Sequence, residues 1–91
     1  MRVVVWFAAA WDDYLSWQQE DKKTLKRINA LIKDIERNGF AGIGKPEALR
    51  GDLSGFWSRR IDAKHRLVYR LVGEDADRLE ILSCRTHYEQ Q

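Results

Sequence analysis

The sequence is poor in the residues that build disulfides and metal sites. Its 91 residues contain one cysteine, Cys84, and two histidines, His65 and His87. A single cysteine forms no internal disulfide, and these histidines belong to no cluster with metal-ligand spacing. Both observations favour a reduced, cytoplasmic compartment. We expect Cys84 and His65 to be structural residues of the core.

Long hydrophobic runs and the common enzyme signatures are also missing. There is no phosphate-binding glycine loop, nucleophile elbow or zinc motif. The one apolar run, residues 3–11, resembles the core of a short secretory signal with an alanine-rich cleavage site at residues 8–10. It is too short to span a membrane, and its β-branched and aromatic start favours a buried strand. We therefore predict no membrane segment.

Charge is present in quantity but is unevenly distributed. The net charge is +2, yet residues 22–37 hold six Lys/Arg against two acids, and residues 45–70 hold seven against three, so each segment is +4. A local positive excess attracts polyanions such as RNA, although an ordinary solvated surface has the same composition.

Hydrophobic periodicity predicts a single domain, residues 1–91, with six elements. The elements are a strand at 2–7, helices at 8–19 and 22–38, and strands at 56–62, 65–72 and 79–84. This β-α-α-β-β-β order predicts an α+β fold in which two helices pack on one face of a mainly antiparallel four-stranded sheet. The other face is then partly open to water and carries one set of strand arginines.

The apolar residues of each predicted helix mark the face that it turns to the sheet. On the first helix they are Trp11, Leu15 and less clearly Tyr14. On the second they are Leu25, Ile28, Leu31 or Ile32, and Ile35, while Asp21 caps the start and Gly39 ends the helix.

The long glycine-containing stretch 40–55 is the first candidate for a functional loop. Glu47 follows the only proline there, so its carboxylate is either aimed by the backbone or simply exposed. The other candidates are arginines of the predicted strands and two residues near the end of the sequence. The arginines either form an anion-binding surface together or are ordinary residues that face solvent. These candidates are Arg59, Arg60, Arg66 and Arg70, then His87 and Tyr88.

Four fragments in order resemble YoeB-type toxins of the RelE/ParE superfamily, and the resemblance runs from Trp6 to Tyr88. The fragments read G-K-P-E at 44–47, L-S-G-F-W-S-R-R-I at 53–61, H-R-L-V-Y at 65–69 and C-R-T-H-Y at 84–88. The resemblance implies a RelE-like microbial ribonuclease fold and cofactor-free, metal-independent cleavage of mRNA in the A site of the 70S ribosome. It also implies a YefM-like antitoxin as partner and a possible homodimer.

Matched residue by residue, the resemblance implies Glu47 as general base, His87 as general acid and Arg66 as the stabiliser of charge on the scissile phosphate. Tyr88 helps to set the site. The residues that contact RNA or its phosphates are expected to be Lys45, Arg50, Arg59 and Arg60. Arg50 stands where such toxins often have lysine, and Ala48 replaces a common proline.

Two other functions remain open from the sequence. A ParE-like protein shares this fold and poisons DNA gyrase without cutting RNA, and a basic sheet with two helices suits that role as well. A degenerate toxin would keep only antitoxin or RNA binding. The combination of Glu47, Arg66 and His87 favours the ribonuclease.

Overall fold

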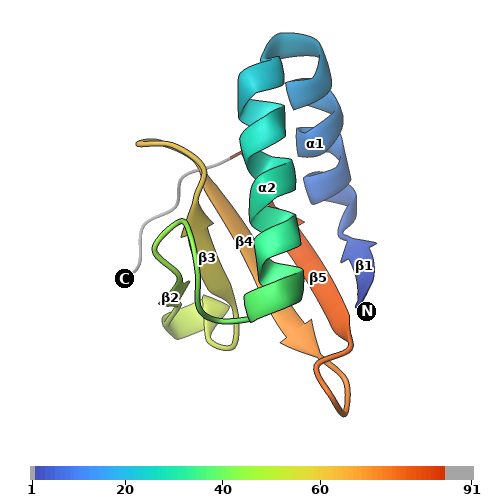
Figure 1. The fold of residues 1–91 in the computed structure, drawn as a ribbon, viewed down its shortest axis with the longest axis vertical. Coiled ribbons are helices and arrows are strands. Elements are labelled where there is room, and N and C mark those ends of the chain that lie inside the picture. Colours follow the sequence, from blue (N-terminus) through green and yellow to red (C-terminus); the bar gives the residue numbers. More distant parts are fainter. Residues whose placement is uncertain (1, 86–91) are drawn as a thin grey trace.

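A computed structural model of the chain describes residues 2–85 and has a two-layer α+β architecture, with two helices over one face of a sheet (Figure 1). His87 and Tyr88 lie outside the described residues. The structure contains the six predicted elements, each with bounds within two residues of the prediction, and two short elements that were not predicted. In chain order the elements are β1 (Val3–Trp6), α1 (Ala8–Glu20), α2 (Lys22–Asn38), β2 (Glu47–Ala48), the 3-10 helix η1 (Gly51–Leu53), β3 (Trp57–Arg60), β4 (Arg66–Val72) and β5 (Arg78–Ser83).

The sheet has five strands in the order β1-β5-β4-β3-β2, one more than predicted. The additional strand, β2, pairs antiparallel with β3 through Glu47–Ser58 and Ala48–Trp57. Two residues are too few to show the alternation by which a strand is recognised in a sequence. The pairs β3–β4 and β4–β5 are antiparallel as predicted, whereas β1 runs parallel to β5.

Helix α2 follows the sequence prediction closely. The Asp21 carboxylate accepts hydrogen bonds from the backbone N–H groups of Lys23 and Thr24 at 3.1 and 3.2 Å and so caps the helix. Gly39, at φ 64°, ends it and donates its N–H to the Ile35 carbonyl. Leu31, rather than Ile32, completes the fully buried stripe with Ile28 and Ile35.

The inner face predicted for α1 was wrong for Trp11 and Leu15, whereas Tyr14 packs against the core as predicted. Trp11 and Leu15 are 44% and 40% exposed, and the buried residues of the helix are Ala10 and Trp17. The Trp17 indole N–H donates to the Cys84 carbonyl at 2.9 Å, which docks this face against the end of β5. The rotation of the helix thus agrees with a contact to a distant segment and not with the spacing of its apolar residues.

The core lies between α2 and the middle strands of the sheet. Leu67 and Tyr69 of β4 and Leu79 and Ile81 of β5 are fully buried against the helices. Cys84 belongs to the same cluster, and burial raises the pKa of its thiol to about 12. Along β4 the residues between these buried ones point to the opposite face, which carries the candidate site. No helix within residues 2–85 is long and apolar enough to cross a membrane.

We predict that Leu31→Ala lowers the free energy of unfolding by about 2–5 kcal/mol, because it removes a fully buried side chain and leaves a cavity. Leu15→Ala is the matched control, since it makes the same change on a helix at a side chain that is 40% exposed. It should cost at most about 1 kcal/mol. Denaturant unfolding curves measure both. Equal losses would contradict the placement of the core.

Candidate functional site on the open face of the sheet

The register of β2, β3 and β4 places the predicted base and the predicted phosphate-binding arginines on one face. Glu47 pairs with Ser58, and Ser58 pairs with Val68, so these side chains form one row. Arg60 pairs with Arg66 and forms the next row on the same face. Their strand neighbours Arg59 and Leu67 point the other way, beneath the helices. The face that bears Glu47 and Arg66 is therefore the one that the helices leave uncovered.

Glu47 and Arg66 stand on neighbouring rows of the same face of the sheet. They lie two strands and one row apart, which corresponds to backbones separated by roughly 10–13 Å. Both side chains are long and project to the same side of the sheet.

Arg66 is oriented by the turn that precedes its strand. One of its guanidinium nitrogens donates to the carbonyls of Asp62 and His65, at 2.8 and 3.1 Å. The turn itself is held by the Asp62 carboxylate, which accepts from the backbone N–H groups of Lys64 and His65. These bonds, together with Arg66 nearby, hold the pKa of Asp62 below its usual value against the effect of burial. These two bonds hold the Arg66 guanidinium against the turn through one of its nitrogens and leave the N–H groups of the other nitrogens outside this contact.

The remaining predicted cations surround Glu47 at the ends of its short strand. Lys45 precedes Pro46 and has a left-handed backbone, with φ 51°, and Arg50 stands just before η1. Both side chains are exposed. Arg60 is exposed on β3, and its backbone N–H donates to the Gly44 carbonyl at 2.7 Å. Cationic residues therefore lie on both sides of the carboxylate.

Arg70 lies on the same open face, but its side chain binds residues outside the candidate site. Its Nε donates to Glu80 at 2.7 Å, and its guanidinium lies 4.8 Å from the centre of the Phe56 ring. Glu80 also pairs with Arg78 at 3.0 Å. This network marks the far end of the face from Arg60 and Arg66.

The prediction that Arg59 contacts RNA does not agree with the structure. Its side chain is fully buried on the helix side of the sheet, and it binds Asp34, Tyr69 and three backbone carbonyls. Alternation along β3 puts Arg59 inside once Arg60 is outside. Sequence reasoning also missed Asp34, because nothing in the basic helix α2 distinguishes this acid from a surface residue.

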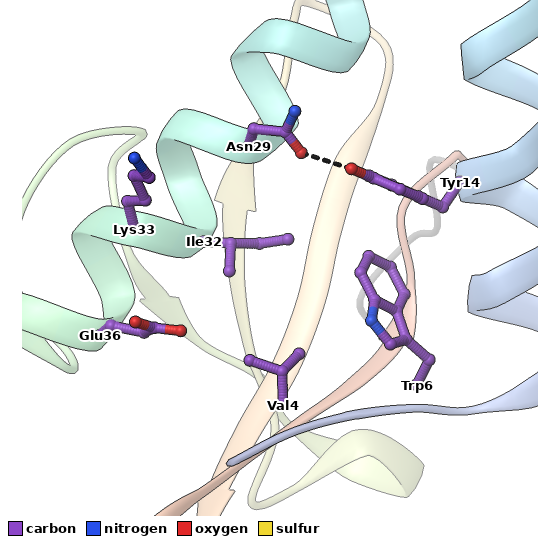
Figure 2. Close-up of a pocket in the computed structure, with 7 residues that line it drawn as sticks. All are labelled: Val4, Trp6, Tyr14, Asn29, Ile32, Lys33 and Glu36. Atoms are coloured by element: carbon purple, nitrogen blue, oxygen red, sulfur yellow. Dashed lines mark hydrogen bonds between the residues drawn. The ribbon is translucent and has the colours of Figure 1, made fainter. Parts of the chain in front are cut away.

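A groove lies on the helix side of the molecule and contains none of the predicted site residues. Its volume is about 530 Å³, and it lies between α1, α2 and β1 (Figure 2). Figure 2 shows the Tyr14 hydroxyl bonded to the Asn29 side chain, at 2.7 Å, across its upper end. Its walls are formed by Val4, Trp6, Tyr14, Asn29, Ile32, Lys33 and Glu36.

Comparison with known proteins assigns the chain to a family. The family described as YoeB-like toxin of bacterial type II toxin-antitoxin systems matches residues 6–88. Toxin YoeB of Synechocystis is 60% identical over 88% of this chain and 90% of its own length. Toxin YoeB of Escherichia coli K12 is 54% identical over 93% of this chain and 98% of its own length. The chain therefore belongs to the YoeB-like toxins of type II toxin-antitoxin systems.

Solved structures of related proteins have the same fold. A YoeB/ParE toxin from Agrobacterium tumefaciens superposes with a TM-score of 0.91 at 51% identity, over 97% of this chain and all of that chain. YoeB in a heterotetrameric YoeB–YefM complex from Staphylococcus aureus gives 0.86 at 45% identity, over 97% and 99% of the two chains. YafQ from Escherichia coli, at 17% identity and a TM-score of 0.70, shares the fold alone.

The ion pair beneath the site predicts a specific response to acid. The hydrogen bond from Arg59 holds the pKa of Asp34 below its ordinary value. A depressed pKa adds stability that is complete above the unfolded-state pKa, about 3.9, and is lost as the pH falls through the folded-state pKa. Asp34→Asn should therefore be less stable near neutral pH, but lose less stability between about pH 5 and pH 2. Urea unfolding at several pH values checks this; parallel curves for the two proteins would contradict it.

Proposed function

We propose that this protein is a ribosome-dependent endoribonuclease that cleaves mRNA in the A site and so inhibits translation. The observation that carries the proposal is the shared open face of Glu47, Arg60 and Arg66, with a carboxylate one row from two guanidinium groups. Family membership supports the same reaction class. A carboxylate among cations suits acid–base chemistry on a phosphodiester better than it suits nucleic-acid binding alone.

The reaction needs only groups that the chain and the RNA provide. Glu47 takes the proton of the ribose 2′-hydroxyl, and the 2′-oxygen attacks the adjacent phosphorus. Arg66, with Arg60 beside it, stabilises the charge that develops on the phosphate. The bond from phosphorus to the 5′-oxygen breaks, and His87 gives that oxygen a proton. The products are a 2′,3′-cyclic phosphate and a 5′-hydroxyl.

His87 and Tyr88 enter this mechanism through the resemblance to YoeB-type toxins, since both lie outside the described residues. An imidazole suits the acid step because its ordinary pKa, about 6.5, lies well above that of a carboxyl group, about 4.3. Two groups of different intrinsic pKa can thus take opposite roles, the carboxylate as base and the imidazole as acid. We assign Tyr88 to the support of this arrangement.

The cations around Glu47 provide the surface for RNA. We assign Lys45, Arg50 and Arg60 to backbone phosphates of mRNA and of ribosomal RNA, because exposed Lys and Arg supply most of the affinity for nucleic acids. Arg59 is not part of this set. Each contact between a cation and a phosphate strengthens the binding of RNA, and this contribution decreases as the salt concentration rises.

We further propose an antitoxin as a partner and a homodimer as a possible assembly. Solved YoeB from Staphylococcus aureus occurs both as a dimer and in a complex with YefM. A YefM-like antitoxin with an acidic segment would fit the cationic open face and prevent mRNA from reaching it.

We predict that Glu47→Gln, Arg66→Ala and His87→Ala each lower the rate of mRNA cleavage on purified ribosomes. Loss of the base or the acid should cost about 10²–10⁴-fold. Loss of the Arg66 guanidinium should cost about 10²–10³-fold. Primer extension on a defined mRNA measures the rate, and all three variants should keep the thermal unfolding profile of the wild type.

Glu36→Gln is the matched control for the base, because it removes a half-buried carboxylate on α2 that lines the groove of Figure 2 instead. It should leave cleavage unchanged. Full activity of Glu47→Gln would remove Glu47 from the role of base. Growth arrest with intact transcripts and a DNA-damage response would instead identify a ParE-like gyrase poison.

A further inference from the structure

One buried arginine holds the loop that leads to the candidate base. All five N–H groups of the Arg59 guanidinium have an acceptor, which is the full donor capacity of this side chain. Nε donates to the Tyr69 hydroxyl at 3.2 Å, and the terminal nitrogens donate to the Asp34 carboxylate and to three backbone carbonyls. The carbonyls are those of Gly39, Ala41 and Ile43, at 2.7, 2.7 and 3.1 Å.

The three carbonyls belong to alternate residues of the segment that joins α2 to β2, so this segment curves around the guanidinium. Asp34 reinforces the curve, because it also accepts the backbone N–H of Ile43 at 3.1 Å. A side chain at Gly42 is excluded, since its Cβ would lie 1.9 Å from the Asp34 carboxylate. Burial raises the pKa of Tyr69, which keeps its hydroxyl protonated so that it can donate to the Gly39 carbonyl.

The clamped segment connects directly to Glu47. Gly44 follows Ile43 and accepts the backbone N–H of Arg60 at 2.7 Å, and a Cβ on Gly44 would come within 2.8 Å of Leu31. Lys45 and Pro46 then lead into β2. Because β2 contains only two residues, its pairing with β3 is too short to fix the loop alone.

We propose that Arg59 is a positioning residue, which acts from the interior to place Glu47 on the opposite face of the sheet. This inference rests on the proposed function and deepens it. Strand β3 then serves the site on both faces: Arg60 faces the RNA, and its neighbour Arg59 holds the loop that carries the base. The Arg59 guanidinium fixes the backbone of segment 39–46, and this segment in turn fixes where the Glu47 carboxylate lies.

The test compares Arg59→Met with Arg2→Met. Methionine keeps an unbranched apolar side chain and removes every donor. Arg2 is the matched control, because its guanidinium also donates to backbone carbonyls, those of Ile35, Glu36 and Ala76 at 2.7–2.9 Å, but to none in the loop. Amide hydrogen exchange is measured over residues 39–48 and over β4 and β5, and kcat and KM of cleavage are measured per folded molecule.

We expect Arg59→Met to speed exchange in residues 39–48 while β4 and β5 stay protected, and to lower kcat about 10²-fold with a smaller change in KM. Arg2→Met should leave both the loop and kcat as in the wild type. If Arg59→Met does not fold, Arg59→Lys replaces it, since lysine keeps the charge near Asp34 but has three donors in place of five.

The inference is overturned if amide hydrogen exchange in residues 39–48 of the Arg59 variant stays as slow as in the wild type. It is also overturned if exchange there becomes faster but kcat stays at the wild-type value. A defect confined to the fraction of folded protein, with normal kcat per folded molecule, also overturns it, because that result describes a purely structural arginine. If the wild type does not cleave mRNA, the proposed function fails. The exchange data then still decide whether Arg59 clamps the loop.

Discussion

The alternation of side chains along β3 is the constraint on which the site depends. Successive residues of a strand face opposite sides of a sheet, so the neighbours Arg59 and Arg60 have different environments although their side chains are identical. Arg60 is exposed beside Arg66, and Arg59 is fully buried beneath the helices. A buried guanidinium is tolerable only when its charge and its donors are satisfied, and Asp34, Tyr69 and the loop carbonyls do this.

The two faces of the sheet differ in composition because successive side chains alternate between them. Two helices cover one face, and nearly all of the large buried apolar residues lie between them and β4 and β5. The other face lacks a helical layer and is free to carry charge, which is ordered there by strand register and by short-range partners such as Glu80 for Arg70. The apolar core that stabilises the fold and the charged residues of the open face thus lie on opposite faces of one sheet. A substitution on one face affects the other face mainly by shifting the backbone of the strands.

Periodicity in the sequence was sufficient for most of the fold. Helix α2 has a regular apolar stripe, a cap at Asp21 and a glycine at its end, and all three are local signals. The face of α1 was mispredicted because it depends on a bond between Trp17 and the distant Cys84 carbonyl. The fifth strand was missed because two residues carry no pattern. For the site, the register puts the side chains of Glu47, Arg60 and Arg66 on one face. The burial of Arg59 could not be predicted without knowing which side of the sheet the helices cover.

The parallel pairing of β1 with β5 has a consequence for the synthesis of this protein. The pair joins Val3 to Arg78 and Trp6 to Ile81, so the first strand to be made finds its neighbour only when most of the chain exists. Contacts between such distant segments slow folding, because the intervening chain must be closed into a loop before they form. The complete sheet, and with it the arrangement of the open face, therefore arises late in translation or after it.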